Sequence, residues 1–396
     1  MTTMLDITCR DPIVARDGRP FGVGQGNRMR SLDWPLPSVL AGSLRTILGK
    51  AANRGFSLDV AQDLLQVEVA GPIPRTSKQF YLPAPEDCVV HPKLGALRAL
   101  PQSQNGGGCD WPVTGLVPVG LTQTQATEDF KPAQAPAWWP LDLYTAWLAG
   151  DDIAFDEHFL GAPEKEERTH VKIDPAVGAS EDSQLFTTAA LALSHLPRCR
   201  TGDKAAHSQT ANAERQQQTF APIMLSARVR ANGWCGETVA KLDVLHPFGG
   251  ERRVAHWQAT ADTQAWTCPQ KLRDVLAQAQ RVRMVLATPA IFSDGWKPGW
   301  LDDALVGSPP GIDTRLRLVA VSIARWKAVS GWSLAELPGQ PRGPKPVKRM
   351  VPAGGVYFFE IVEGKASHLA ERWLESVSDD AQDRRDGFGV AAWGIW

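Results

Sequence analysis

The sequence has no apolar run near the ~18 residues that a membrane-spanning helix requires, so we expect no membrane partner. It contains neither a dinucleotide fingerprint nor a P-loop, and neither the H-E-x-x-H nor the G-x-S-x-G motif. The six cysteines are too widely spaced for a C-x-x-C pair, which excludes the usual zinc and redox motifs. The first residues lack the basic and apolar regions of a signal peptide, which predicts a cytoplasmic protein with free thiols. We therefore expect no metal and no cofactor.

The chain has 396 residues and a formal net charge of −1, which excludes a protein that is basic over its whole surface. A nucleic-acid surface, if present, has to be local, and the charge is indeed partitioned. Residues 10–54 carry a net charge of +5 and residues 341–350 carry +4, whereas residues 151–167 carry −6.

Tyrosine is scarce (3) and tryptophan common (15), and three tryptophans are expected in the core: Trp332, Trp393 and Trp396.

Hydrophobic periodicity predicts a mixture of strands and helices. Alternating apolar residues predict strands at the following ranges: Met4–Cys9, Ala221–Arg230, Val254–Thr260, Val282–Ala287, Leu316–Arg325, Val356–Val362 and Val390–Trp396. Helical spacing predicts four helices, the first with Ser38 as its N-cap: Ser38–Asn53, Glu237–Leu245, Pro269–Ala279 and Ser367–Val377. The alternation in Arg168–Thr188 predicts an extended β-excursion.

A loose internal repeat links the two halves of the sequence. Each half ends with a helix, a glycine loop beside arginines and a short strand that contains tryptophan. Phe248–Gly250 precedes Val254–Trp257 in the same way that Phe388–Gly389 precedes Val390–Trp393. Two βαββαβ units, which are ferredoxin-like domains, would produce this order. Chance similarity between short glycine loops is the alternative.

The segment after the first predicted strand combines glycines with arginines. Glycines let a backbone approach an anion, and guanidinium groups bind phosphate oxygens. The segment therefore predicts a phosphate-binding loop, with a solvated surface loop as the alternative. Its residues are: Arg16, Arg19, Gly22, Gly24, Gly26, Arg28 and Arg30.

Two further segments have features of RNA contacts. The cations Arg342, Lys345, Lys348 and Arg349 lie among prolines with no acid nearby, which is typical either of a strip that follows phosphates or of a solvated linker. Near the C-terminus, a Gly-aromatic-Gly sequence follows basic residues, as in the RNA-contacting strand of the RRM fold, although Asp386 interrupts the pattern. The aromatic ring there either stacks on a base or packs into its own sheet.

Candidates for catalysis are few. His246 and His256 flank the inner glycine loop and His170 lies in a basic stretch, so any of them has the chemistry of a general base toward a ribose hydroxyl. A structural histidine is the alternative at each position.

Taken in order along the chain, the sequence resembles the third subunit of the type III-B CRISPR RNA-guided effector, the Cmr complex, within the RAMP superfamily. The resemblance rests on an ordered set of short stretches that covers nearly the whole chain: Arg16–Gly22, Pro35–Arg45, Tyr81–Pro85, Ile173–Pro175, Leu185–Thr188, Phe248–Arg253, Thr288–Phe292, Ser330–Trp332, Pro344–Pro346, Val351–Tyr357 and Gly387–Gly389.

The resemblance implies an α+β fold with two ferredoxin-like RAMP domains, at residues 1–265 and 266–396. The first would contain an insertion at about residues 55–140 and a thumb-like β-excursion at about residues 168–188, which would displace a nucleotide of the guide–target duplex. The implied role is that of a non-catalytic subunit that holds the 5′ tag of the guide RNA, near the target RNA. It would join the large polymerase/cyclase-like subunit to a backbone RAMP subunit.

From the residues and the resemblance together we predict a set of RNA contacts: Arg16, Arg19, Arg28, Arg30, Arg45, Arg168, His170, Lys172, Arg252, Arg253, Lys345, Lys348 and Arg349. The glycine loops beside them contain these glycines: Gly22, Gly24, Gly26, Gly249, Gly250, Gly387 and Gly389. Two alternatives remain. One is a metal-independent endoribonuclease that processes repeat RNA with a histidine near a glycine loop, and the other is a subunit that makes protein contacts only.

Overall fold

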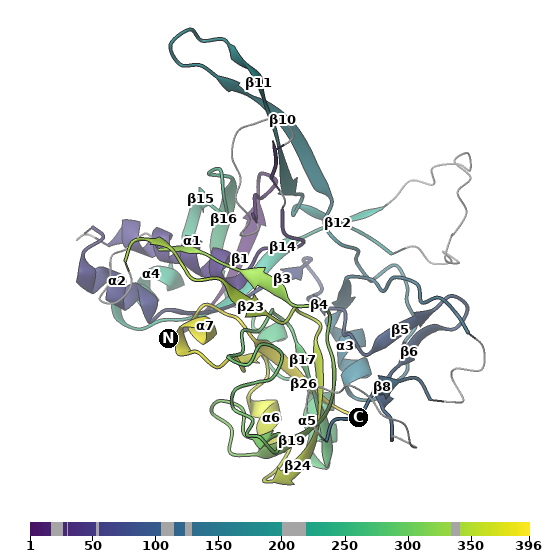
Figure 1. Cartoon of the computed structure of the whole chain (residues 1–396). Helices are drawn as coiled ribbons and strands as arrows, with labels where there is room; N and C mark the ends of the chain where they lie inside the picture. Colours follow the sequence, from purple (N-terminus) through teal and green to yellow (C-terminus); the bar gives the residue numbers. More distant parts are fainter. Residues whose placement is uncertain are drawn as a thin grey trace.

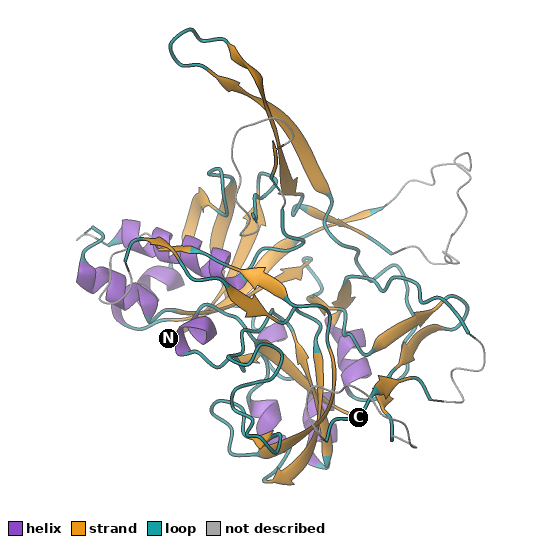
Figure 2. Cartoon of the chain, viewed as in Figure 1, coloured by secondary structure: helices purple, strands orange, loops and turns teal. Residues whose placement is uncertain are grey.

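The computed structural model describes residues 1–16, 27–29, 31–52, 55–103, 115–122, 129–199, 219–333 and 341–396. These residues form a mixed α/β structure with more strand than helix (Figure 2). Two antiparallel sheets organise it, and each sheet has its own hydrophobic core.

The first sheet is formed mainly by the N-terminal half of the chain. Its strands lie in this order: β15 (Asp243–Pro247), β16 (Val254–Thr260), β1 (Thr2–Cys9), β14 (Met224–Arg230) and β3 (Glu68–Arg75). Helices α1 (Pro37–Ala51), α2 (Leu58–Leu65) and α4 (Gly233–Ala240) pack together beside it (Figure 1). In β1, Leu5, Ile7 and Cys9 are buried and alternate with half-buried residues, because successive side chains of a strand point to opposite faces.

The second sheet is formed by the C-terminal part of the chain. Its strands lie in this order: β18 (Val306–Gly307), β19 (Arg315–Ser322), β24 (Val356–Glu363), β17 (Arg281–Leu286), β26 (Val390–Ile395) and β25 (Glu375–Ser376). Four neighbouring strands have the same spatial order in both sheets, which is fourth, first, third and second along the chain. They are β16, β1, β14 and β3 in the first sheet, and β26, β17, β24 and β19 in the second. Helix α5 (Gln270–Ala277) precedes β17 and packs on α6 (Ser367–Glu371) and β26. Residues 287–314, all of which are described, form no helix between β17 and β19.

Parts of the segment between β3 and residue 165 pack on the second sheet, although the segment lies within the predicted first domain. Helix α3 (Leu141–Leu148) contacts α5 and β26. Its buried aromatic side chains Tyr144 and Trp147 belong to the same core as β17. The segment also contains three small two-stranded units: β4 (Tyr81–Pro83) with β9 (Trp138–Pro140), β5 (Cys88–His91) with β6 (Gly95–Arg98), and β7 (Leu100–Pro101) with β8 (Val119–Gly120).

A long hairpin extends away from both sheets (Figure 1). Strands β10 (Lys165–Ile173) and β11 (Ser180–Leu191) form it, and β2 (Asn27–Arg28) pairs with β11 in parallel near its base. We call this hairpin the thumb, and it confirms the predicted β-excursion. The pair β12 (His195–Pro197) and β13 (Phe220–Pro222) follows it along the chain.

A second hairpin segment crosses the molecule near α1. It contains β20 (Lys327–Val329) paired with β23 (Lys348–Met350), and β21 (Trp332–Ser333) paired with β22 (Gly343–Pro344). We call its described residues, 325–333 and 341–350, the strap.

The predicted strands are confirmed, and Ala221–Arg230 is divided into β13 and β14. The helix boundaries differ more. The prediction that Ser38 is the N-cap of the first helix is wrong. Leu36 is the N-cap of α1, and the helix begins at Pro37, because proline's fixed φ suits the first helical position. The predicted helix Glu237–Leu245 is instead the end of α4 followed by β15. The predicted Ser367–Val377 helix ends at Glu371, because the chain then turns to pair β25 with β26.

Four of the described cysteines have free thiols: Cys9, Cys88, Cys235 and Cys268. Trp393 is fully buried and Trp396 is half-buried, but the expectation that Trp332 lies in the core is wrong. Its side chain is 62% exposed because the strap turns it outward.

Candidate nucleic-acid interface

The thumb presents cations on one face. Arg168, His170 and Lys172 alternate along β10 and therefore share that face. The imidazole ring of His170 is stacked on the Phe186 ring of β11, with 5.0 Å between ring centroids. Its Nε2 lies 2.9 Å from the Thr188 hydroxyl. The opposite face of the thumb is apolar toward its tip, where Val171, Ile173 and Leu185 are about half exposed, and Val177 in the turn is 72% exposed.

Among the described residues, the thumb cations Arg168 and Lys172 form ion pairs at the protein surface. Arg168 pairs with Glu166, and Lys172 pairs with Glu181 at 2.8 Å. Exposed pairs of this kind contribute about 0–1 kcal/mol. Both cations are therefore free to exchange a carboxylate for a phosphate at little cost.

The N-terminal arginine segment reaches the base of the thumb. Arg28 pairs with Glu167 of β10, and the Met29 amide donates to the Thr187 carbonyl at 2.8 Å. Arg16 is exposed. The remaining predictions for this segment lie outside the described residues, and they are: Arg19, Arg30, Gly22, Gly24 and Gly26.

The inner glycine loop is packed against the N-terminal segment. Gly249 has φ +77°, and a Cβ there would lie 2.7 Å from the Val14 carbonyl oxygen. The Gly250 amide donates to that same oxygen at 2.8 Å. Glycine is therefore required here by the approach of the chain's own backbone. Arg252 is exposed and forms no ion pair with a described residue, whereas Arg253 is largely buried and pairs with Glu251.

The C-terminal glycine loop is packed in the same way. A Cβ on Gly387 would lie 2.5 Å from the Val69 carbonyl oxygen, and one on Gly389 would overlap Ser378. The ring of Phe388, between them, is 2% exposed and packs in a small core with Leu36. Of the two predictions for this ring, packing into the protein is therefore confirmed.

The structure places Arg45 inside the molecule, not on an RNA-accessible surface. Its guanidinium lies 2.5 Å from an Asp386 carboxylate oxygen and donates to the carbonyls of Leu64 and Val67. The side chain is 13% exposed. Arg45 therefore joins α1 to the C-terminal glycine loop, and the prediction of an RNA contact does not fit this geometry.

The predicted strap cations are divided between its two faces. Lys345 and Arg349 are exposed. Lys348 instead turns toward the second half of the protein and pairs with Asp383 at 2.7 Å. Burial raises the pKa of Asp383, and the charge of Lys348 opposes that shift. The Lys348 side chain is about half exposed, but its partner Asp383 is only 10% exposed, so we expect Lys348 to hold the strap in place and not to contact RNA.

The histidines considered for catalysis are bound to protein groups. The Nε2 of His246 lies 3.1 Å from Lys50 Nζ, and its Nδ1 lies 3.0 Å from the Pro247 carbonyl oxygen. Burial lowers the pKa of His246, so its imidazole is neutral at pH 7. His256 pairs with Asp243 at 2.5 Å. Both ring nitrogens of His246 therefore lie within hydrogen-bond distance of groups of the protein itself.

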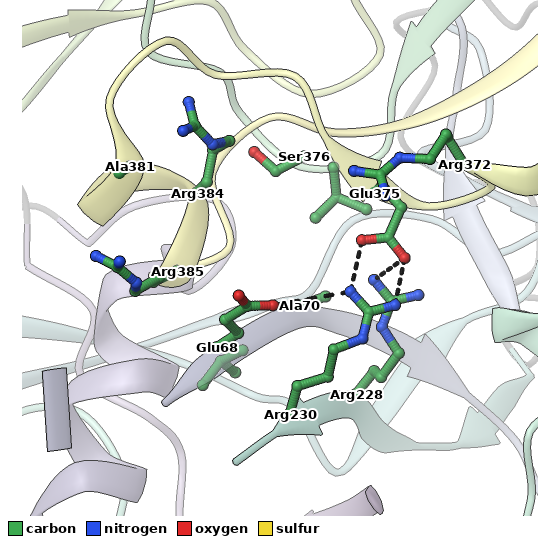
Figure 3. Close-up of a pocket in the computed structure, with 12 residues that line it drawn as sticks. Glu68, Ala70, Arg228, Arg230, Arg372, Glu375, Ser376, Ala381, Arg384 and Arg385 are labelled. Atoms are coloured by element: carbon green, nitrogen blue, oxygen red, sulfur yellow. Dashed lines mark hydrogen bonds and ion pairs between the residues drawn. The ribbon is translucent and has the colours of Figure 1, made fainter. Parts of the chain in front are cut away.

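A polar pocket that the sequence did not predict lies between the two halves (Figure 3). Its volume is about 280 Å³, and Arg228, Arg230, Arg372, Glu68 and Glu375 are among the residues that line it. Figure 3 shows the guanidinium groups of Arg228 and Arg230 converging on the Glu375 carboxylate. The nitrogen–oxygen distances of these two ion pairs are 3.0 and 2.5 Å. The sequence feature that could have predicted this pocket is the presence of Arg228 and Arg230 in the otherwise apolar strand β14, because a charged residue in a buried strand requires a partner.

Burial and charge act together in this pocket. Burial lowers the pKa of Arg228 to about 10. Burial alone would raise the pKa of Glu375, but the hydrogen bond from Arg230 and the charge of Arg228 outweigh it and hold that pKa below its ordinary value. The ionised pair therefore connects the first sheet to β25 of the second.

Replacing Glu375 by Gln should destabilise the protein by about 2 kcal/mol at pH 7, because it leaves the buried Arg228 charge without a counterion. Because the pKa of Glu375 is lower in the folded protein than its ordinary value of 4.5, the ionised carboxylate contributes its full stabilisation at pH values above 4.5. This contribution is lost as the pH falls through the lowered pKa. Urea unfolding at several pH values should show wild type and variant converging in acid. Glu371→Gln, at an exposed position, is the control. Parallel pH profiles for wild type and Glu375→Gln would refute this account.

Within the described residues, no three His, Cys, Asp or Glu side chains are placed to hold a metal ion. Among the same residues, no helix is long and apolar enough to cross a membrane.

Two antiparallel sheets of matching strand order, with an exposed cationic hairpin, define a mixed α/β protein built on a repeated unit. The chain belongs to the family described as CRISPR-associated protein (Cas_Cmr3), whose model matches residues 5–396.

Solved structures of low sequence identity are also similar to this chain. A chain in the cryo-EM structure of the type III-B Cmr-beta bound to cognate target RNA is 14% identical, with a TM-score of 0.45 over 90% of this chain and 86% of that one. A chain of the same complex bound to target RNA and AMPPnP is 13% identical, with a TM-score of 0.44 and the same coverage. A chain of the Csm3–Csm4 subcomplex in the type III-A CRISPR-Cas interference complex is 8% identical, with a TM-score of 0.37, over 91% of this chain and 95% of that one. No curated protein matches the chain.

Proposed function

We propose that this chain is the non-catalytic subunit of a type III-B CRISPR effector complex that holds the 5′ tag of the guide RNA. Its family membership supports a role in a CRISPR system. The repeated strand order supports two ferredoxin-like halves of the RAMP type. Its partners would be the guide RNA, the target RNA near the tag, the large polymerase/cyclase-like subunit and a backbone subunit, in the cytoplasm.

The thumb is the observation that carries this proposal. It consists of paired strands of 9 and 12 residues that extend into solvent, with weakly held cations beside a stacked His–Phe pair. Cations bind phosphates and aromatic rings stack on unpaired bases, so this face has the chemistry of an RNA contact. The proposed role of the thumb is to displace a nucleotide of the guide–target duplex. We take as contacts with the guide and target those predicted cations, apart from Lys348, that are exposed in the described part of the structure, together with His170: Arg16, Arg28, Arg168, His170, Lys172, Arg252, Lys345 and Arg349.

The double variant Arg168→Gln with Lys172→Gln tests the proposal. Each phosphate contact to a single strand contributes about 0.7 to the slope of log K against log salt, so the slope for tag RNA should fall by about 1.4. Between 50 and 200 mM salt, the loss of affinity should then be about sevenfold smaller than for wild type. Fluorescence anisotropy with labelled tag RNA measures both quantities.

Arg315→Gln with Arg317→Gln is the matched control. These two arginines also lie on one strand and are about half exposed, and each is near a glutamate, but their strand belongs to the second sheet. The control should leave the salt slope unchanged. An unchanged slope in the thumb variant would exclude the thumb as a phosphate contact.

A further inference from the structure

The strap has one face on the protein and one face in solvent. Register pairs Lys327 with Met350 and Val329 with Lys348, and paired residues share a face of a hairpin. On that face, Val329 and Met350 are 7% and 2% exposed, in a core that also contains Phe388. The alternate residues of both strands must therefore point outward.

Two tryptophans lie on the outward side. Trp326 is 49% exposed and Trp332 is 62% exposed, and the neighbouring Val347 is 69% exposed. The Arg349 guanidinium lies over the Trp326 ring, 5.0 Å from its centroid. All the other tryptophans placed in the structure are buried or half-buried, so the exposed ones are concentrated in the strap. Large exposed aromatic side chains on one segment mark a binding surface.

The charge of the strap is of one sign. Its described residues include six cations and no acid. Lys327 and Lys348 are bound to acids of the body, Asp33 and Asp383. The other four are exposed and form no ion pair with a described residue: Arg325, Arg342, Lys345 and Arg349.

We propose that the outward face of the strap binds single-stranded RNA by stacking bases on Trp326 and Trp332. The adjacent cations would contact the phosphates. Aromatic rings interleaved with cations are the usual means by which proteins hold unpaired nucleic acid without reading its sequence. Arg349 beside Trp326 supplies a cation at the stacking position itself. This inference rests on the proposed function, since it specifies a second place where that subunit contacts RNA.

The positive charge of the strap favours RNA over a protein partner. An interface core between proteins is depleted of charged residues, whereas the described part of the strap has four exposed cations with no ion pair to a described residue, and one of them lies over the Trp326 ring. Each phosphate neutralised by such a cation adds to the affinity through counterion release.

The test measures the affinity of the whole chain for a fluorescent oligouridine at several salt concentrations. Trp326→Leu with Trp332→Leu should raise the dissociation constant about thirtyfold or more, because stacking two bases contributes at least that factor. Its salt slope should not change, since no phosphate contact is removed. Arg342→Gln with Lys345→Gln should weaken binding and lower the slope by about 1.4.

The control is Phe220→Leu, which removes an exposed aromatic ring outside the strap. It should leave the affinity for oligouridine unchanged, and all variants should melt like wild type because the replaced side chains are exposed. An unchanged affinity in the tryptophan variant would overturn the inference. If that variant kept its RNA affinity but lost other subunits of the effector on purification, the strap would be a protein interface instead. The thumb variant tests the proposed function separately. If it lowers the salt slope for tag RNA while the tryptophan variant keeps its affinity for oligouridine, only the strap proposal is contradicted.

Discussion

Replacing Asp87 by Asn should lower the free energy of unfolding by about 3–5 kcal/mol, because it leaves a buried arginine without a counterion. Asp87 and Arg283 form an ion pair in which both side chains are 0% exposed. The Asp87 carboxylate also accepts a hydrogen bond from Trp147 Nε1 at 3.0 Å. The pair joins the segment before the thumb to β17 at the centre of the second sheet. Urea denaturation at neutral pH measures the loss.

Two further variants separate the ion pair from general damage. Asp274→Asn changes an exposed aspartate and should alter stability by less than about 0.5 kcal/mol. Asp87→Leu with Arg283→Met removes both charges together and should recover most of the stability, since buried ion pairs can often be replaced by apolar residues of similar volume. A single Asp87→Asn variant as stable as wild type would show that the two parts are held by packing alone.

Replacing Gly387 by Ala should destabilise the protein by about 2–3 kcal/mol, because it combines backbone strain with a steric overlap. The residue has φ +91°, and its Cβ would lie 2.5 Å from the Val69 carbonyl oxygen of β3. The loop therefore fits between the two halves only if this position is glycine. Thermal or urea unfolding monitored by circular dichroism measures the effect.

Gly150→Ala is the matched control for the strain alone. Its φ is +96°, and the nearest atom to an added Cβ is in the Ile395 side chain at an ordinary 3.7 Å. It should cost about 1 kcal/mol, clearly less than Gly387→Ala. Equal losses at the two positions would show that the approach of Val69 does not matter.

Strands of this protein were predictable from the sequence because their buried side chains follow a simple period. The bounds of β16 agree with its alternation residue for residue, and β14, β17, β19 and β24 differ from prediction only near their ends. The thumb was predicted for the same reason. The helices were less predictable, since their ends depend on backbone conformations, such as φ +54° at Leu374, that no periodicity encodes.

Side-chain roles that depend on distant partners could not be predicted. Arg45 lies on a predicted helix beside a cationic loop, but its carboxylate partner is 341 residues further along the chain. Lys348 and Arg349 are adjacent in the sequence, yet they point to opposite faces because a hairpin pairs them with β20. The sequence predicts Trp332 in the core, but the strap turns its side chain toward solvent, where it is 62% exposed.

The most direct measurement of the central claim is photo-crosslinking in the assembled effector, with 4-thiouridine placed in the first nucleotides of the guide RNA. The account predicts crosslinks from the tag to peptides of this chain that contain the thumb, around His170, and the strap, around Trp332. The same guide with 4-thiouridine only at its 3′ end is the control and should give no crosslink to this chain. Tag nucleotides that crosslink only to other subunits, in complexes that contain this chain, would contradict the proposal that it holds the guide RNA.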